Sequence, residues 1–559
     1  MLFHISEQQE QHRQKVREFA EKVVKPVAFK LDQASEFPKD IVKQMGELGF
    51  LGVPFPKEYG GQGLDNTCYA ITVEELSRVD GGVGVICSAH TSLGAWPIFG
   101  FGTEEQKQKY LTPLAKGEKI GAFGLTEPNA GSDAGGTETT AVLDGDNYIL
   151  NGTKIFITNG KEADTYVIFA STDPSKGVKG ISAFIVEKGW EGFTFPTQYD
   201  KLGIRSSITS ELNFKNVKVP KENLLGELGE GFKIAMATLD GGRIGIGAQG
   251  LGIAQGAYEE ALAYVKEREQ FGAPVAIHQG VSFKIADMAT AIEASRMMIY
   301  RAAEIKTAGK GRYTKEAAMG KLMATDTAEW VTSEALQLHG GNGFIKGLPV
   351  ERHYRDAKIT QIYEGTNEIM RLVISSQLLG RLGKKKDAPE KKTPKSATGE
   401  RKNVIFSGSP EEQAKQLVEA LKADGYTFGG EVDIYAPVAG STRCVAAGQG
   451  LGDKSQMPII EALAKACGAV VGSSRPAAEM HEFTPIDRYI GLSGQNFDGE
   501  LYIACGISGA RQHLRGIRDA KTIVAINKDP DAPIFINADY GLVGDLHEIV
   551  PALTKVFLA

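Results

Sequence analysis

The stretch FGLTEPNAGSDAGG (Phe123–Gly136) stands where helical sequence gives way to β-strand sequence. From Ser6 to about Leu114, apolar residues recur at helical spacing between glycine-rich turns. After the stretch, β-branched segments such as TYVIFAST alternate with Gly and Asn turns, and long helical patterns then return up to about Leu382. This order predicts three consecutive domains: an all-α N-terminal domain (1–118), a central β-barrel or sandwich (119–226) and a helical domain (227–383).

A sharp change in composition follows at residues 384–402, KKKDAPEKKTPKSATGERK. This segment has eight basic and three acidic side chains, two prolines and almost no apolar residue, so it cannot form a core. We interpret it as a basic flexible linker. Beyond it, segments such as EEQAKQLVEALKADG and KTIVAIN alternate between helical and strand patterns. Residues 403–559 are therefore predicted to form an open α/β sheet.

The composition excludes several classes of protein. The 559 residues carry 63 basic and 69 acidic side chains, and the net charge of −6 argues against nucleic acid as the main partner. Five cysteines without a C-x-x-C pair argue against zinc ribbons and the common iron–sulfur spacings, so no metal site is predicted. The uncharged run Gly81–Thr103 holds six glycines and a proline, which indicates buried helix ends and a turn rather than a membrane span. The charged start does not match a signal peptide, and a cytoplasmic location is expected.

Two neighbouring motifs suit a flat cofactor. The N–H groups of the loop at Phe123–Gly136, with the hydroxyls of Thr126 and Ser132, can bond a heteroaromatic ring or a pyrophosphate, although such a loop is equally often a surface turn. The segment KIFITNG (Lys154–Gly160) adds a strand whose side chains can lie against a ring. By contrast, Gly245, Gly247 and Gly250 match G-x-G-x-x-G inside a helical pattern, which indicates close helix packing rather than a dinucleotide site.

Four further motifs complete a set: DGGR at 240–243, REQFG at 268–272, QLHGGNGF at 337–344 and IYEGTNEI at 362–369. In this order, the six motifs resemble the acyl-CoA dehydrogenase family over roughly residues 1–383. The resemblance implies an all-α N-terminal domain, a central β-domain and a C-terminal four-helix bundle. It also implies a bound FAD and a homotetramer in which a neighbouring subunit completes the FAD site.

The resemblance assigns the cofactor contacts to particular residues. From the first motifs and the last one they are Phe123, Leu125, Thr126, Ser132, Phe156, Ile157, Thr158, Thr366 and Glu368. Arg268, Phe271 and Gln279 would approach FAD from one subunit. Gln337, Leu338, His339, Gly340 and Gly341 would approach it from the other.

Glu364 is the expected catalytic base. The reaction removes an acidic proton from the carbon next to a thioester, and a desolvated carboxylate suits that task. Glu364 lies in YEGT, which matches the base motif of the family, whereas taken alone it would be an exposed carboxylate in a turn between helices. Branched- and long-chain relatives carry their base just before the arginine equivalent to Arg243, where this chain has Gly242. On the substrate side the resemblance implies Ser132, Asp240, Arg243, Tyr363 and Gly365.

The region after the linker resembles the FAD domain of electron-transfer flavoprotein α subunits. In GISGARQH a strand ends and a helix begins, which presents N–H groups to a phosphate. Two departures are Gln449, where the family usually has arginine, and Leu492, where it has a polar residue. A purely structural α/β appendage is the alternative. The implied FAD contacts are Ser473, Ser474, Arg475, Gly491, Ser493, Ser508, Gly509, Ala510, Arg511, Gln512, His513, Asn527, Asp545 and Leu546.

Together these resemblances imply a short-chain acyl-CoA dehydrogenase or enoyl-CoA reductase that interconverts butyryl-CoA and crotonyl-CoA. It would exchange electrons with a separate electron-transfer flavoprotein, in a setting that includes electron bifurcation, and a second FAD in the tail would relay electrons. One alternative is an aryl-acrylyl-CoA reductase with a wider pocket. In another, the tail is a docking module without a redox role.

Overall fold

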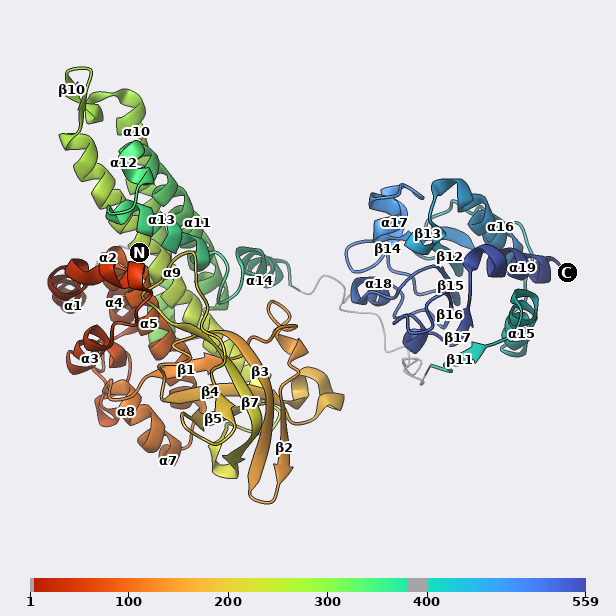
Figure 1. Ribbon diagram of the computed structural model, residues 1–559, viewed down its shortest axis with the longest axis horizontal. Helices are drawn as coiled ribbons and strands as arrows, with labels where there is room; N and C mark the ends of the chain where they lie inside the picture. The colour runs from red at the N-terminus through yellow and green to blue at the C-terminus, as the bar shows by residue number, and fades with distance from the viewer. Residues whose placement is uncertain (1–4, 381–400) are drawn as a thin grey trace. The chain divides into compact units, whose positions relative to one another are not determined.

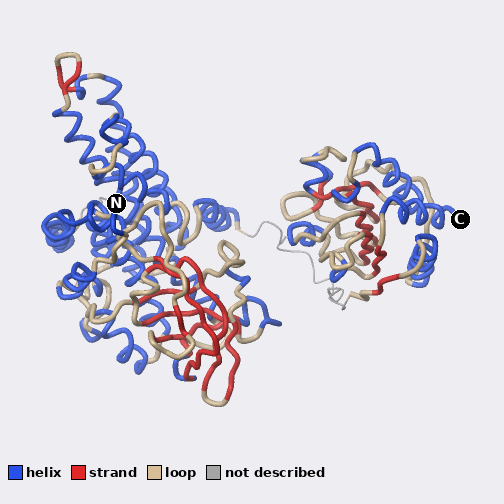
Figure 2. Tube along the Cα trace, viewed as in Figure 1, coloured by secondary structure: helices blue, strands red, loops and turns tan. Residues whose placement is uncertain are grey.

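The computed structural model describes residues 5–380 and 401–559, which form two compact units (Figure 1). In the first unit, helices precede and follow a group of strands, and the second unit alternates strands and helices (Figure 2). The predicted order of helical, β and helical domains followed by an α/β domain is confirmed. In the described parts of the chain, no helix is long and apolar enough to cross a membrane, and no group of three or more His, Cys, Asp or Glu side chains could hold a metal ion.

The N-terminal domain is a cluster of short helices. Its first helix begins at a capping box in which Ser6 and Gln9 bond each other's backbone N–H groups. The run Gly81–Thr103 folds into buried α5, a π-helical turn and α6, as its composition indicates. The helices are α1 (Glu7–Phe19), α2 (Lys25–Ala34), α3 (Lys39–Glu47), α4 (Asn66–Val79), α5 (Gly81–Ala89), α6 (Trp96–Phe101), α7 (Glu104–Gln106) and α8 (Thr112–Ala115).

The central domain is one sheet of eight strands in the order β6-β7-β3-β2-β4-β5-β8, with β1 added parallel to β4. Its two halves join through a single pair, Thr140 and Ser171, and Tyr148 of β3 packs edge-on against Phe184 of β5. The halves therefore enclose a core between them, in agreement with the expected β-domain. The strands are β1 (Gly121–Gly124), β2 (Thr140–Asp144), β3 (Asn147–Thr158), β4 (Thr165–Ser171), β5 (Ile181–Glu187), β6 (Phe193–Thr194), β7 (Thr209–Pro220) and β8 (Leu224–Leu225).

Long helices form the C-terminal domain of the first unit, and α9 runs through its centre against α4, α11 and α13. The glycines of the G-x-G-x-x-G pattern lie within α9. A Cβ on Gly245 would stand 2.2 Å from Ser88 Oγ and one on Gly247 2.1 Å from Ile299 Cδ1, so these positions allow close helix packing. The elements are α9 (Gly231–Glu267), β9 (Glu269–Gln270), β10 (Ala273–Pro274), α10 (Gln279–Ala308), α11 (Thr314–His339), α12 (Gly341–Phe344), α13 (Pro349–Thr360) and α14 (Asn367–Leu379).

All three domains of the first unit meet at two buried aspartates. Asp80, at the start of α5, accepts a hydrogen bond of 2.6 Å from Ser206 Oγ of the central domain. Asp356 of α13 accepts another from the backbone N–H of Ile204, in the same loop. The loop at residues 204–207 is thus held by carboxylates from both helical domains.

The second unit is a seven-stranded, fully parallel sheet in the order β11-β17-β16-β15-β12-β13-β14. From β12 the chain proceeds outward through β13 and β14, then returns to the other side of β12 as β15. This arrangement places a topological switch point between β12 and β15, where open α/β sheets bind ligands. The strands are β11 (Val404–Phe406), β12 (Arg443–Ala447), β13 (Val470–Ser474), β14 (Tyr489–Ile490), β15 (Leu501–Cys505), β16 (Thr522–Asn527) and β17 (Tyr540–Val543). The helices are α15 (Pro410–Ala423), α16 (Met457–Cys467), α17 (Arg475–Glu479), α18 (Arg511–Gly516) and α19 (Leu546–Leu558).

Most of the expected linker lies outside the described residues. Its last two residues are described, and they belong with the α/β unit rather than with a linker. Arg401 forms an ion pair of 2.9 Å with Asp539, and Lys402 bonds Asp424 and, at 2.8 Å, the hydroxyl of Tyr540. Arg401 and Lys402 are ordered with this unit because it offers both cations acidic or hydroxyl partners.

Candidate active site

A cavity of about 310 Å³ in the first unit brings together eleven of the predicted site residues. Its walls come from β1 and the following loop, the end of β3, α9 and the turn between α13 and α14. Apolar residues that the sequence did not single out line it as well, among them Leu93, Phe232 and Leu239. The predicted residues it gathers are Phe123, Leu125, Thr126, Ser132, Phe156, Ile157, Thr158, Arg243, Tyr363, Glu364 and Gly365.

A buried ion pair anchors the loop of this cavity. Lys154 Nζ lies 2.6 Å from Glu127 Oε1 and donates to the backbone O of Leu125 at 3.1 Å. Glu127 also accepts hydrogen bonds from the backbone N–H groups of Glu138 and Thr139, which closes the loop on itself. Burial lowers the pKa of Lys154 to about 8, and the attraction of Glu127 opposes that effect. The Lys154–Glu127 ion pair thus fixes the position of Leu125 and its neighbours in the loop.

Phe156 reaches the cavity because β3 is irregular there. The pairing of β3 with β7 shifts register between Lys154 and Ile157, and Phe156 adopts a φ of +60°. Such a bulge turns a side chain away from the normal alternation of the strand. The ring is 60% exposed and lies 4.9 Å from the ring of Tyr199, so it presents a free aromatic face beside the cavity.

Glu364 occupies the turn between α13 and α14, with its side chain on the cavity wall. Glu364 and Gly365 have φ values of +51° and +97°, a rare succession that directs the turn. Oε2 of Glu364 is buried and has no hydrogen-bond partner among the described residues. Burial raises the pKa of Glu364 to about 8, while Lys321 and Arg243 act in the opposite direction. A buried carboxylate with a free oxygen and a raised pKa is suited to accept a proton from a bound molecule.

Arg243 lines the same cavity, and Asp240 lies behind it. Arg243 Nη1 donates to Asp240 Oδ1 at 2.6 Å, and Thr314 Oγ1 donates to the other oxygen of Asp240. Arg243 Nε is buried without a partner among the described residues. Arg243 and Glu364 line a cavity that also offers the hydroxyls of Thr126, Ser132 and Thr158, so the residues present fit a polar ligand with a flat ring.

A chain of hydrogen bonds holds Tyr363, which lines the cavity next to Glu364. The hydroxyl of Tyr363 donates to Gln249 Oε1, and Gln249 Nε2 donates to the backbone O of Gly81 at 2.8 Å. Gln249 is fully buried in α9. Its role was not foreseen, because a glutamine in a helical pattern gives no signal of its own. The chain of bonds fixes the position of Tyr363.

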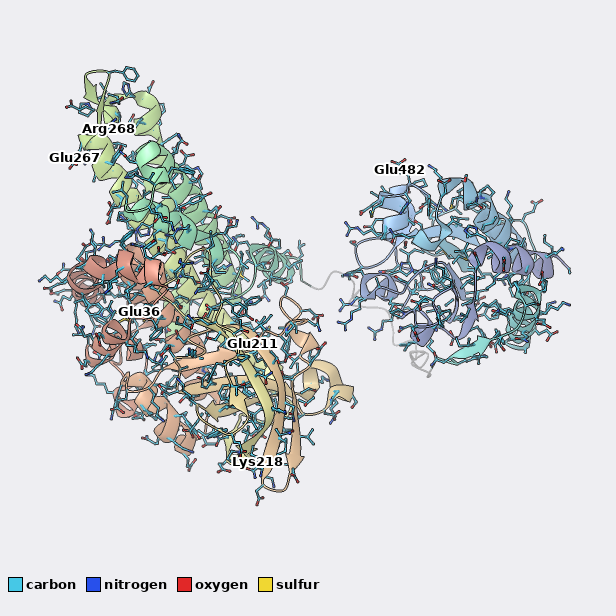
Figure 3. All side chains as sticks on the ribbon, in the orientation of Figure 1. Glu36, Glu211, Lys218, Glu267, Arg268 and Glu482 are labelled. Carbon is cyan, nitrogen blue, oxygen red and sulfur yellow. The ribbon has the colours of Figure 1, made fainter. Side chains whose placement is uncertain are left out.

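The remaining predicted FAD contacts of the first unit lie elsewhere. Arg268 and residues 337–341 line one open groove of about 740 Å³, although the resemblance assigned the two sets to opposite subunits. Figure 3 labels Arg268 at the outer end of α9, away from the strands of the central domain. Phe271 is 95% exposed in the hairpin beside it, and Gln279 begins α10. Near the cavity, Thr366 caps α14 and Glu368 lies in its first turn. A single chain therefore holds two separate parts of the expected site.

The second unit has a cavity of about 370 Å³ at its topological switch point. His513 lines it with Nε2 bonded to the hydroxyl of Tyr502 at 2.9 Å, and burial lowers its pKa to about 4. Its Nδ1 is buried and has no partner among the described residues. Gln449 and Leu492, the two departures from the family, line the cavity too. The predicted residues found there are Ser474, Arg475, Gly491, Ser493, Ser508, Ala510, Gln512, His513 and Asn527.

Five predicted residues of the second unit do not line this cavity. Ser473 bonds Thr484, Asp545 caps α19 and Leu546 is part of the core. Gly509 and Arg511 flank the turn into α18. These five residues lie in or just after the ends of β13, β15 and β17, next to the segments that line the cavity.

Comparison with known proteins matches both units. The models of the N-terminal, middle and C-terminal domains of acyl-CoA dehydrogenases match residues 6–118, 122–217 and 229–379. The electron transfer flavoprotein FAD-binding domain matches residues 437–518.

Individual relatives match about two thirds of the chain. The short-chain specific acyl-CoA dehydrogenase of Clostridium acetobutylicum is 59% identical over 378 residues, which are 68% of this chain and 100% of the relative. The structure of butyryl-CoA dehydrogenase from Megasphaera elsdenii is similar with a TM-score of 0.67 and 51% identity, over 68% of this chain and 100% of that one. A chain in a structure described as the electron transferring flavoprotein of Acidaminococcus fermentans, in work on flavin-based electron bifurcation, has 57% identity and a TM-score of 0.67 over the same shares.

Proposed function

The chain belongs to the acyl-CoA dehydrogenase family of FAD-dependent oxidoreductases, and from this premise we propose that it interconverts butyryl-CoA and crotonyl-CoA with Glu364 as the base. The single observation that carries the proposal is the free, buried Oε2 of Glu364 on the wall of the cavity. The names of the relatives from Clostridium acetobutylicum and Megasphaera elsdenii support the short-chain assignment.

Glu364 would act on a substrate held between α9 and the turn. Oε2 takes the proton from the carbon next to the thioester, and the backbone N–H of Glu364 polarises the thioester carbonyl. Phe123, Thr126, Ser132 and Thr158 would hold FAD along the loop and strand. When bound, FAD supplies the acceptor for the hydride equivalent that leaves the adjacent carbon. The apolar walls exclude water, which keeps the proton on Glu364.

The cavity favours a short acyl chain. The bulky Tyr363, held by Gln249, lines it beside the base, and the apolar side chains of Leu93 and Leu239 line it as well. An aryl-acrylyl-CoA reductase would need a wider cavity at this end. A competition assay with crotonyl-, hexenoyl- and cinnamoyl-CoA separates the two functions: preference for crotonyl-CoA is expected, and preference for the aryl substrate would refute the assignment.

The variant Glu364→Gln tests the base. It keeps the size of the side chain but cannot accept the proton, so turnover of butyryl-CoA should fall by about 10²–10⁴-fold. Glu304→Gln, on the exposed surface of α10, is the matched control and should behave as the wild type. Turnover of Glu364→Gln within about threefold of the wild type would show that another residue is the base.

We further propose that a second copy of the chain completes the FAD site, within a homotetramer. The groove at Arg268 and residues 337–341 lies apart from the cavity of its own chain, and the nearby Phe271 and Phe344 are 95% and 86% exposed. Arg268 and residues 337–341 line one groove, so we infer that the same neighbouring subunit supplies both to the FAD site. Light scattering should give the mass of four chains, and Phe271→Ala should lower retention of FAD.

For the second unit we propose a second FAD that relays electrons to a separate electron-transfer flavoprotein in the cytoplasm, in a bifurcating system. The cavity at the switch point and the unpartnered Nδ1 of His513 support a ligand there. The alternative is a docking module without a redox role. Two FAD molecules per chain in the purified protein support the relay, and one per chain supports the docking module.

A further inference from the structure

A lysine far from the motifs lies directly beneath the turn that carries Glu364. Lys321 is in α11, and its side chain is fully buried. Its Nζ donates to the backbone O of Gly365 at 2.9 Å and to Asn367 Oδ1 at 2.8 Å. It therefore spans from α11 to both sides of the turn into α14.

The surroundings of Lys321 make this contact unusual. A buried ammonium is costly without a counter-ion, and in the described parts of the chain no carboxylate forms an ion pair with it within 4.0 Å. Its two acceptors are a carbonyl and an amide, both neutral. The charged groups that act on it are Glu364 from the turn, Asp326 from α11, Glu368 from α14 and Arg243 from α9. Among the anions, Glu364 has the largest effect.

The turn needs such an anchor. Glu364 and Gly365 both have positive φ values, which are costly for a residue other than glycine. Without contacts that stabilise it, such a turn would adopt other backbone conformations. Thr325, one helical turn after Lys321, shares Asn367 with it, and Asn367 Nδ2 also donates to Asp326. The start of α14 is thus bonded to α11, and Lys321 is the member that reaches back to Gly365.

We propose that Lys321 is a positioning residue for Glu364: it fixes the turn through its hydrogen bonds to Gly365 O and Asn367 Oδ1. This inference rests on the proposed role of Glu364. Charges act on Glu364 from Lys321 of α11 and Arg243 of α9, and the titratable hydroxyls of Tyr363 and of Tyr69 in α4 interact with it electrostatically. Burial lowers the pKa of Lys321 to about 7 and raises that of Glu364 to about 8, so the lysine is largely neutral at the pH where the carboxyl ionises, and its hydrogen bonds carry its role.

Two substitutions test the anchor. Lys321→Met removes both hydrogen bonds, so kcat for butyryl-CoA should fall by about 10–100-fold with a smaller change in KM, as expected when a base is misplaced. Lys321→Gln keeps a side-chain N–H donor and should retain more of kcat than Lys321→Met. Thr332→Val is the control, because this buried hydroxyl of α11 donates only to the backbone O atoms of Ala328 and Glu329, and it should leave kcat unchanged.

A measurement that does not depend on catalysis shows whether a variant has lost the anchor or has misfolded. Hydrogen–deuterium exchange of the backbone amides at residues 361–369 should be faster in Lys321→Met and close to the wild type in Lys321→Gln. If Lys321→Met does not fold, Asn367→Ala decides: it removes one of the two acceptors of Lys321 and should also speed exchange at residues 361–369. Unchanged kcat and exchange in the folded variants would overturn the proposal. Failure of the base assignment is recognised separately, since Glu364→Gln would then stay active whatever Lys321 does.

Discussion

The backbone of Gly242 faces the carboxylate of Glu364 so closely that a Cβ built on Gly242 would lie 2.0 Å from Glu364 Oε2. The two positions are far apart in sequence, one in α9 and one in the turn before α14. By the family resemblance, the position of Gly242 is where branched- and long-chain relatives carry their base. A carboxylate side chain at position 242 and that of Glu364 would occupy the same space.

Replacing Gly242 by alanine should disturb the base directly. The methyl group would stand 2.0 Å from Oε2 and 3.0 Å from Leu93 Cδ2, so the carboxylate must move. A displacement of about 1 Å can cost about 10²-fold in rate, and kcat for butyryl-CoA should fall by that order. Gly100→Ala is the control, because its Cβ would meet nothing closer than 3.5 Å. Equal kcat values for the two variants would contradict the geometry.

The pH profile of kcat/KM should rise toward the alkaline side. Burial raises the pKa of Glu364 to about 8, and the base must be ionised to accept a proton. Below that value kcat/KM should therefore increase about tenfold per pH unit and then level off. We would measure kcat/KM with butyryl-CoA between pH 6 and 9.5, at substrate concentrations well below KM, so that the profile reports the pKa of the free enzyme. A profile that is flat from pH 6 upward would mean that Glu364 is ionised throughout.

Replacing Gln249 by alanine should relax the preference for short acyl chains. The change removes the acceptor of the Tyr363 hydroxyl, so the Tyr363 side chain, which lines the cavity, is free to move away from it. The ratio of kcat/KM for hexanoyl-CoA to that for butyryl-CoA should rise by about tenfold, the usual effect of one or two methylenes in an apolar pocket. Gln255→Ala, in the same helix and bonded to Glu259, is the control. An unchanged ratio would place the chain-length limit elsewhere.

Replacing Asp356 by asparagine should flatten the pH dependence of stability. Burial and the neighbouring Asp80 raise the pKa of Asp356 to about 7. A carboxyl with a raised pKa stabilises the folded state fully below its unfolded value of about 4, and this stability is lost as the pH rises through the folded value. Asparagine stays neutral and can still accept from Ile204 N–H. Between pH 5 and 8.5 the Tm of the variant should fall less than that of the wild type.

A surface substitution checks the reading of Asp356. Asp146→Asn changes a carboxyl whose side chain is 97% exposed and should follow the wild type over the same pH range. Parallel Tm curves for Asp356→Asn and the wild type would show that Asp356 does not titrate in this window.

Much of this architecture could be predicted from the sequence, because periodicity and turn residues are local. The helix–strand–helix order and the parallel α/β unit followed from such patterns. Eleven of the motif residues, among them Phe123 and Gly365, line one cavity, whereas Arg268 and residues 337–341 line a separate groove. The supporting side chains could not be predicted: Lys321 and Gln249 lie in ordinary helical patterns, and only tertiary packing buries them.

Two further differences have local causes. Phe156 reaches the cavity through a register shift that depends on the pairing of β3 with β7, which a strand pattern does not reveal. Arg401 and Lys402 were assigned to the linker on its charges, prolines and lack of apolar residues, yet they pair with Asp539 just before β17 and with Asp424 at the end of α15. A charged segment is solvated when it has no partners, but its residues become part of a folded domain when that domain offers counter-ions.

The clamp on residues 204–207 has a consequence for how the first unit unfolds. Asp80 and Asp356 belong to different helical domains, yet both accept hydrogen bonds from one loop of the central domain. Withdrawing the central domain would leave both carboxylates without these donors, and withdrawing a helical domain would leave Ser206 or Ile204 without its acceptor, so the three should melt as a single cooperative block. Calorimetry of the full chain should then resolve the block from the α/β unit as at most two transitions, never four.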